Sequence, residues 1–264
     1  MPGSAVRLGR LLDRTSGRSF MVAFDRTLAM GPESYAEDSS AAITRIAEQG
    51  VDAILLSPGL IKQHGGLLAY RGAPAIVCRL DFPFLGSADR GAGEQFRLIA
   101  SVEEAAALGA DAVVMFHTLG YRDKRAWADN VAAIGAVAER ARRIGMPLIV
   151  EAVPWGAAAD DPRDPTAVAE AARIAAELGA DAIKTEYVGS VDAMRDVVRA
   201  CPVPVFVLGG PRVGLTEVIQ FTDDALEAGA VGVIYGRNVW QRDDLADVAA
   251  ALTRAVHHRE VIAP

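Results

Sequence analysis

The sequence has little lysine, little cysteine and no long apolar segment. Only three of its 27 basic residues are lysine, at Lys62, Lys124 and Lys184, and the rest are arginine. The position of each lysine is therefore informative. Two cysteines, Cys78 and Cys201, lie in or beside short apolar runs, a setting typical of small buried thiols.

No segment approaches the roughly 18 uncharged apolar residues that a membrane-spanning helix needs, and the N-terminal sequence lacks the apolar core of a signal peptide. A formal net charge of -7 repels polyanions, and no local basic stripe offsets it. These absences predict a cytoplasmic protein that binds neither membranes nor nucleic acid and holds acidic small molecules through local groups.

Short apolar runs alternate with longer, alanine-rich stretches of helical spacing. This alternation is typical of βαβ units and a parallel sheet. The 264 residues contain 25 glycines and 13 prolines, scattered without a linker-like cluster, so we expect a single domain over residues 1–264. The expected strands are residues 20–24, 53–56, 75–80, 112–116, 147–152, 182–184, 203–208 and 232–235. The expected helices are residues 39–49, 102–107, 127–143, 166–178, 190–199, 215–228 and 243–257.

One short pattern recurs before three of these strands. Gln49-Gly-Val-Asp-Ala-Ile, Leu108-Gly-Ala-Asp-Ala-Val and Leu178-Gly-Ala-Asp-Ala-Ile share it, and Ala228-Gly-Ala-Val-Gly-Val lacks only the aspartate. Glycine after a helix permits the left-handed turn that leads into the next strand. Eight such units in this length favour a closed (β/α)8 TIM barrel over an open doubly wound sheet.

In such barrels the chemistry gathers at the C-terminal ends of the strands. Lys184 ends the sixth run, where its stem would point into the barrel mouth. An amine removed from water loses its proton more readily and then attacks carbonyl carbon. We therefore expect Lys184 to be a covalent catalyst; the alternative is a surface lysine in an ion pair with Glu186.

Three further side chains end other strands. Asp25 could steer a substrate hydroxyl or move protons, or could cap the following loop. Glu151 and His117 could shuttle protons or orient Lys184, although His117 could equally be a structural histidine. The predicted catalytic set is thus Lys184, Asp25, Glu151 and His117.

Two glycine-rich tips follow the seventh and eighth strands, where barrels bind phosphate through backbone amides and a helix N-terminus. The tips read Leu208-Gly-Gly-Pro-Arg and Tyr235-Gly-Arg-Asn-Val-Trp. Tight turns alone are the alternative. The predicted phosphate-binding residues are Gly209, Gly210, Arg212, Gly236 and Arg237.

Four segments resemble a known family, the class I aldolases that include archaeal-type fructose-bisphosphate aldolase and aminodideoxyheptulosonate synthase. The likeness extends from about Phe20 to Gln241. The segments are Ala23-Phe-Asp-Arg-Thr-Leu-Ala-Met-Gly-Pro, Gly179-Ala-Asp-Ala-Ile-Lys-Thr-Glu-Tyr, Val207-Leu-Gly-Gly-Pro-Arg and Gly229-Ala-Val-Gly-Val-Ile-Tyr-Gly-Arg-Asn-Val-Trp-Gln.

The resemblance implies a carbon–carbon lyase of carbohydrate metabolism with Lys184 as the Schiff-base residue and Asp25 as the active-site aspartate. It implies that the two glycine tips cradle the substrate phosphate. It implies no metal and no organic cofactor, and it implies a homo-oligomer, often a decamer.

The chain departs from the family pattern at two positions. Relatives carry an acid/base tyrosine after the fifth strand, where this chain has Val153, and relatives often have Asp-His-Gly where this chain has Asp25-Arg26-Thr27. Because valine cannot move protons, the task would pass to Glu151, Asp25, His117 or a tyrosine such as Tyr121 or Tyr187. Trp155 could stack on a substrate or pack at the rim.

Three functions fit the residues. The first is an aldolase that makes or cleaves a bond of a phosphorylated ketose, with a donor similar to dihydroxyacetone phosphate. The second is a transaldolase-like, ring-forming or acyl-cleaving enzyme with the same lysine, and the third is a non-catalytic barrel that binds a phosphometabolite. The acceptor aldehyde depends on the loops 58–73, 82–94 and 156–164, whose Arg71, Arg90 and Arg163 could meet a second anion.

Overall fold

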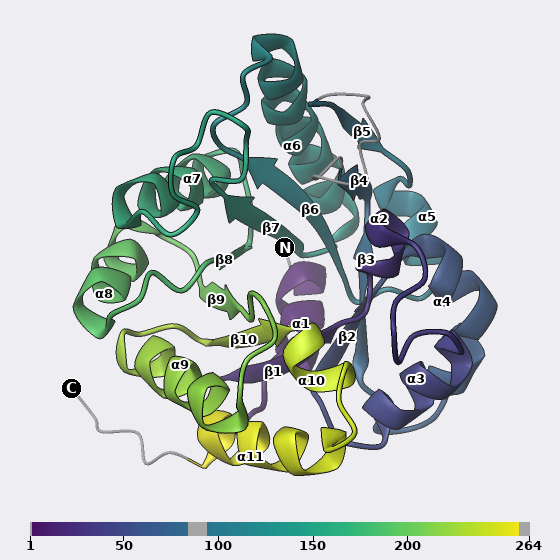
Figure 1. Cartoon of the computed structure of the whole chain (residues 1–264). Helices are drawn as coiled ribbons and strands as arrows, with labels where there is room; N and C mark the ends of the chain where they lie inside the picture. The colour runs from purple at the N-terminus through teal and green to yellow at the C-terminus, as the bar shows by residue number, and fades with distance from the viewer. Residues whose placement is uncertain (1, 84–93, 259–264) are drawn as a thin grey trace.

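The computed structural model describes residues 2–83 and 94–258. In these residues, eight parallel strands pair edge to edge in the order β1-β10-β9-β8-β7-β6-β3-β2 and close into a barrel (Figure 1). The predicted (β/α)8 barrel is confirmed, and each strand lies within two residues of its expected bounds. The barrel strands are β1 (Ser19–Ala23), β2 (Ala53–Leu56), β3 (Ala75–Arg79), β6 (Ala112–Thr118), β7 (Leu148–Val153), β8 (Ala182–Thr185), β9 (Val205–Leu208) and β10 (Gly232–Tyr235).

Helices between the strands surround the barrel (Figure 1). Several of these helices begin with a side-chain cap. The Ser101 side chain accepts a hydrogen bond from the Glu104 amide at the start of α5, and the Asp164 side chain accepts one from the Thr166 amide at the start of α7. The surrounding helices are α3 (Ser39–Ala47), α4 (Pro58–His64), α5 (Val102–Ala107), α6 (Lys124–Ile144), α7 (Pro165–Glu177), α8 (Val191–Ala200), α9 (Leu215–Glu227) and α11 (Leu245–His257). No described helix is both long enough and apolar enough to cross a bilayer.

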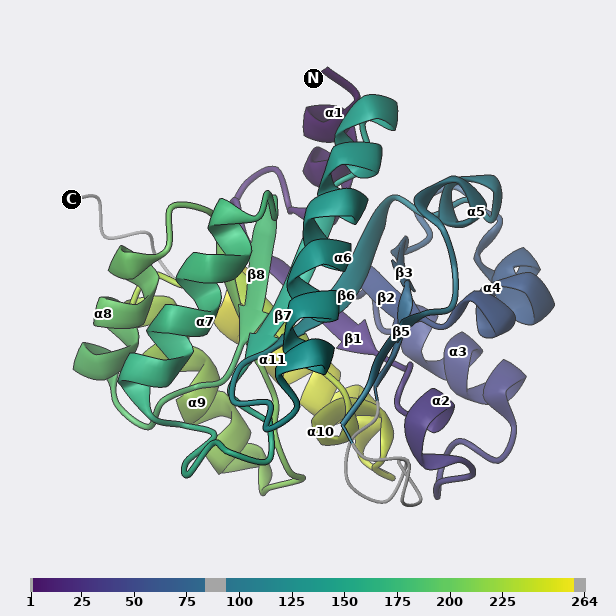
Figure 2. The same ribbon diagram turned by 90° about the horizontal axis from the view of Figure 1, so that it is seen from above.

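The sequence patterns did not predict several short elements of the fold. Helix α1 lies at one end, and α2 and α10 lie at the other (Figure 2). Leu8, Leu11 and Leu12 from the α1 region pack against the inward side chains of the barrel and close its N-terminal end. The unpredicted elements are α1 (Pro2–Leu11), α2 (Thr27–Met30), α4, the 3-10 helix η1 (Gly65–Leu68), the antiparallel pair β4 (Asp81–Pro83) and β5 (Phe96–Leu98), and α10 (Arg237–Trp240).

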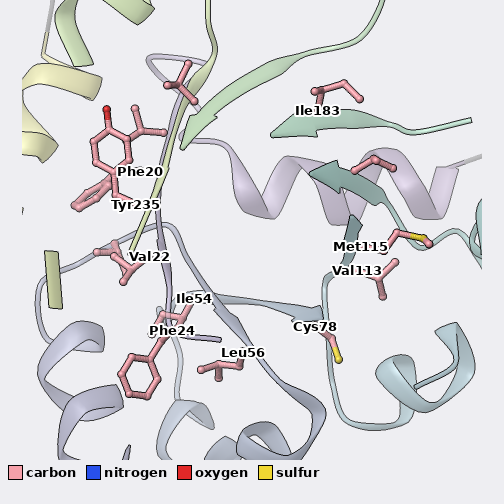
Figure 3. Packing of buried hydrophobic residues seen from close by; sticks show 14 of the residues in the cluster. Phe20, Val22, Phe24, Ile54, Leu56, Cys78, Val113, Met115, Ile183 and Tyr235 are labelled. Carbon is pink, nitrogen blue, oxygen red and sulfur yellow. The ribbon is translucent and has the colours of Figure 1, made fainter. Parts of the chain in front are cut away.

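Side chains alternate across each strand, as the two-residue period of a strand requires. Outward residues such as Val22, Ile54 and Met115 pack against the helices (Figure 3). Inward residues such as Met21 and Val77 fill the barrel axis. Large charged side chains enter the interior only toward the C-terminal ends of the strands, which places a polar site above an apolar floor.

The recurrent glycine–aspartate pattern links neighbouring strands. Its glycines, and the equivalent Gly229, have φ between 68° and 106°, which confirms the predicted left-handed turn. Each aspartate forms two hydrogen bonds with the backbone of one residue at the start of the adjacent strand. The Asp181 amide donates to Leu148 O, and its carboxylate accepts from Leu148 N at 2.9 Å. Asp52 bonds Phe20 and Asp111 bonds Ile76 in the same manner.

Candidate active site

A cavity of about 700 Å³ opens at the C-terminal ends of the barrel strands. Residues from the ends of β1, β3, β6, β7, β8, β9 and β10 line it. Its volume suits a small metabolite rather than a polymer. The predicted residues Asp25, Glu151, Lys184, Gly209, Gly210, Gly236 and Arg237 all line this cavity.

Lys184 lies at the centre of the site. Glu151 and Lys184 are register partners on β7 and β8, and side chains at paired positions of parallel strands project to the same face. The Lys184 Nζ is 2.7 Å from Glu151 Oε1, and the two side chains are only 6% and 4% exposed. Lys184 is therefore buried and paired with Glu151, not a surface lysine paired with Glu186.

Arg79 connects three carboxylates beneath the cavity. Its Nε donates to Asp25 Oδ2 at 2.8 Å, its Nη1 to Asp81 Oδ1 at 3.3 Å, and its Nη2 to Glu151 Oε2 at 2.5 Å. The guanidinium carbon also lies 4.3 Å from the centre of the Phe116 ring. Sequence reasoning missed Arg79, although an arginine within the apolar run Ala75-Ile-Val-Cys-Arg-Leu was a usable signal, because such a residue is rarely buried without partners.

This network fixes the charge of Glu151. Burial opposes ionisation, but the positive charges of Lys184 and Arg79 outweigh it and lower the pKa of the Glu151 carboxyl. The opposite holds for Asp81: burial raises the pKa of its carboxyl to about 6, and the positive charge of Arg79 offsets only part of this effect. Burial alone would lower the pKa of Arg79, yet Asp25, Glu151 and Asp81 together raise it, so the guanidinium stays charged.

Asp25 follows β1 and lines the same cavity, with its side chain 13% exposed. Its Oδ2 is held by Arg79, so the carboxylate is oriented rather than free to rotate. The structure thus brings Lys184, Glu151 and Asp25 together through one buried arginine.

The glycine tips form another part of the wall. Asn238 Nδ2 donates to the carbonyls of Gly209 and Pro211, which holds the first tip to the second. The Arg237 Nη2 donates to Gly210 O at 3.0 Å. A methyl group placed on Gly210 would lie 3.4 Å from Arg163 Nη2, so two guanidinium groups flank this glycine. Arg163, one of the three loop arginines, therefore lies beside the glycine tips.

Four other candidates lie elsewhere. His117 points outward from β6, where its Nδ1 is 3.1 Å from Asn130 Oδ1 on α6, and it does not line the cavity. The reason is strand alternation: Phe116 faces the interior, so its neighbour cannot. Arg212 bonds Gln241 O away from the cavity. Tyr187 donates to Asp224, and Tyr121, although buried, is also absent from the cavity wall.

Arg71 is likewise absent from the cavity wall, and Arg90 lies outside the described residues. Among the described residues, no group of three or more histidine, cysteine, aspartate or glutamate side chains is arranged to hold a metal ion. Both cysteines are buried and unpaired, as expected from their apolar surroundings.

Val153 occupies the mouth of the barrel one layer above Glu151. It is fully buried against Phe116 and Leu208, and Trp155 packs on the same cluster. Trp155 also lines the cavity and donates from Nε1 to Glu186 Oε1 at 3.0 Å. Glu186, which sequence reasoning treated only as a partner for lysine, is 7% exposed and lines the cavity too.

Comparison with known proteins decides the family. Residues 19–242 match the family model described as DeoC/LacD family aldolase. The chain belongs to this family. It is 37% identical over 255 residues to 2-amino-4,5-dihydroxy-6-oxo-7-(phosphonooxy)heptanoate synthase of Streptomyces griseus, covering 96% of this chain and 90% of that protein. It is 32% identical over 251 residues to the class 1 fructose-bisphosphate aldolase of Thermoproteus tenax, covering 91% and 90%.

Solved structures agree with this assignment. An archaeal fructose-1,6-bisphosphate aldolase, with its catalytic lysine covalently bound to the carbinolamine intermediate, superposes with a TM-score of 0.83 at 29% identity and covers 96% of this chain and 99% of its own. This DeoC/LacD-family chain is a class I aldolase and hence a carbon–carbon lyase. The resemblance first drawn from four sequence segments is thereby confirmed.

Proposed function

We propose that this aldolase makes or cleaves a carbon–carbon bond of a phosphorylated ketose through a Schiff base on Lys184. The observation that carries the proposal is the buried ion pair of Lys184 and Glu151, 2.7 Å apart, at the wall of a cavity of metabolite size. A lysine held this way is within reach of a bound carbonyl and has a proton acceptor in contact.

In the proposed reaction Glu151 takes a proton from the Lys184 ammonium. The neutral amine attacks the ketone carbon, and a proton moves from nitrogen to the former carbonyl oxygen to give the carbinolamine. Protonation of that hydroxyl by Glu151 releases water and leaves the iminium ion. Asp25, fixed by Arg79, accepts a hydrogen bond from a substrate hydroxyl. Arg79 is a positioning residue, because it acts through the two carboxylates.

The phosphate of the donor would bind at the glycine tips, between the Gly209-Gly210 and Gly236 backbone and the guanidinium groups of Arg237 and Arg163. Two arginines flanking one glycine supply charge-assisted hydrogen bonds of the kind that hold phosphate. The names of two relatives support a phosphorylated ketose: one is a 6-oxo-7-(phosphonooxy)heptanoate synthase and the other a fructose-bisphosphate aldolase. A donor similar to dihydroxyacetone phosphate fits both names.

Borohydride trapping tests the covalent step without knowledge of the acceptor. The protein is incubated with dihydroxyacetone phosphate, reduced, and examined by intact mass and peptide mapping. We expect one adduct, on Lys184, that is absent from Lys184→Gln and retained in Lys62→Gln, whose lysine is exposed on α4. Thermal unfolding of Lys184→Gln must show a folded protein, because loss of one member of a buried pair is destabilising.

An adduct on Lys62 or Lys124, or none with any phosphorylated ketone, would refute the proposal and favour a barrel that only binds its ligand. Product analysis then separates aldol cleavage from obligatory transfer: cleavage releases a triose phosphate without an added acceptor, whereas a transaldolase-like reaction requires one.

The proposal also covers the setting of the enzyme. We infer one barrel domain over residues 1–264 that acts in carbohydrate metabolism in the cytoplasm as a homo-oligomer, for which the family resemblance implies a decamer. The two buried, unpaired cysteines support a reducing compartment, and the net charge of -7 argues against a nucleic-acid partner. Size-exclusion chromatography with light scattering measures the oligomeric state directly.

A further inference from the structure

The proposed reaction needs a second proton carrier. After the iminium ion forms, a base must remove a proton from the neighbouring carbon, and an acid must protonate the aldehyde oxygen when the new bond forms. The family resemblance implies a tyrosine for this purpose, and Val153 stands at that position in this chain. Val153 is buried among apolar side chains and can do neither.

Glu151 is not suited to this second task. One of its oxygens is bound by Lys184, with which it exchanges a proton during imine formation, and the other is bound by Arg79, so neither oxygen is open to a second proton transfer. Asp25 also has an oxygen bound by Arg79. Both carboxylates are thus committed to the network beneath the substrate.

Trp155 connects Glu186 to the cluster that contains Val153, because it packs on that cluster and donates a hydrogen bond to Glu186. Strands β7 and β8 pair Glu151 with Lys184, and Val153 and Glu186 each lie two residues further along their segments, Glu186 directly after the end of β8. Glu186 and Lys184 both line the cavity, so the two side chains face the same bound substrate.

A hydrogen bond orients the carboxylate of Glu186 through one of its two oxygens. Trp155 Nε1 donates to Oε1 at 3.0 Å, and within the described residues no donor bonds Oε2. Burial raises the pKa of the Glu186 carboxyl, and the Trp155 hydrogen bond and the charge of Arg163 offset only part of this effect. Two carboxylates in one cavity with pKa values displaced in opposite directions are suited to two separate roles.

We propose that Glu186 is the general acid–base residue of carbon–carbon bond formation and cleavage. This role rests on the proposed Schiff base at Lys184. In the synthetic direction Glu186 removes a proton from the carbon next to the iminium carbon, and the C–H electron pair becomes the enamine double bond. The enamine then attacks the aldehyde, and Glu186 returns the same proton to the aldehyde oxygen. No oxidant, metal or further proton donor is required for this balance.

Proton exchange isolates this step from imine formation. Wild-type enzyme and Glu186→Gln are incubated with dihydroxyacetone phosphate in deuterium oxide without an acceptor, and deuterium incorporation is followed by NMR. We expect exchange to slow by roughly 10²–10⁴-fold in Glu186→Gln, while the borohydride adduct on Lys184 still forms. Glu177→Gln, an exposed glutamate on α7, is the matched control and should exchange at the wild-type rate.

The outcomes separate the two proposals. No adduct in the wild-type enzyme would refute the Schiff base, and with it the role of Glu186. Normal trapping with normal exchange in Glu186→Gln would refute Glu186 alone. Loss of trapping in a folded Glu186→Gln protein would also contradict the proposal, because it assigns imine formation to Glu151.

Trp155→Phe provides a pH test that a purely structural role would not move. The groups facing Glu186 are Trp155 and Arg163 after β7, Glu151 on β7 and Lys184 on β8. Loss of the indole hydrogen bond destabilises the Glu186 carboxylate, so the acidic limb of the exchange rate should shift to higher pH. Trp127→Phe, exposed on α6, should leave the limb in place; an unshifted limb in Trp155→Phe would overturn the assignment.

Discussion

The guanidinium of Arg79 donates from Nη2 to Oε2 of Glu151 over 2.5 Å, and both side chains are buried inside the barrel. Because the other oxygen of Glu151 contacts Lys184, this one carboxylate joins the strand that carries the reactive amine to the strand that carries the arginine. The position of Lys184 therefore depends on residues from β3 and β7 as well as on its own strand.

Replacing Arg79 should destabilise the protein strongly. Arg79→Met leaves Asp25, Asp81 and Glu151 without their shared cation, and loss of one partner of a buried ion pair costs about 3–5 kcal/mol. Urea denaturation measures the free energy of unfolding. Arg143→Met removes an exposed helical pair with Glu139 and should cost less than about 1 kcal/mol. Equal losses in the two variants would show that the buried network does not stabilise the barrel.

Glu151→Gln should impair imine formation itself. The amide keeps the size of the side chain but cannot accept the proton of Lys184, so single-turnover trapping should slow by roughly 10²–10⁴-fold. Deuterium exchange per trapped adduct should change far less. A variant that traps at the wild-type rate would remove Glu151 from the proposed mechanism.

The arginines at the glycine tips should act on the phosphate group. For Arg237→Met and Arg163→Met we expect KM for dihydroxyacetone phosphate to rise about tenfold or more, since a charge-assisted hydrogen bond contributes roughly 1.5–3 kcal/mol. Turnover of unphosphorylated dihydroxyacetone should be unaffected in Arg237→Met. Arg212→Met, which bonds Gln241 outside the cavity, is the control for general charge effects. An equal effect on both donors would indicate that these arginines do not contact the phosphate.

His117 should affect acid stability rather than catalysis. Burial lowers the pKa of His117, so below about pH 6.5 the unfolded chain binds a proton that the folded chain does not. The contribution of His117 to stability is thus present above pH 6.5 and lost as the pH falls toward its folded pKa. Thermal unfolding should show that the stability difference between wild type and His117→Gln shrinks as the pH falls from 7.5 to about 5. Trapping on Lys184 should be unchanged. A loss of trapping in folded His117→Gln would instead return this residue to the catalytic set.

The pattern of short apolar runs predicted the eight barrel strands, because a buried strand needs only a local apolar run with a turn signal at each end. It could not find α1, because closing the barrel floor is a requirement of the whole fold, not of the segment itself. Residues 58–73 were expected to form a loop, although local signals for a helix were present there: Ser57 caps α4 and Pro58 begins it.

The sequence by itself determined which residues reach the ends of the strands, because strand alternation and turn chemistry are local. It therefore identified Lys184, Asp25, Glu151 and the glycine tips. Only the tertiary structure decided which of these side chains meet. It turned His117 outward, joined Arg79 to three carboxylates and brought the Trp155 indole to Glu186, because contacts between strands depend on the register of the closed barrel.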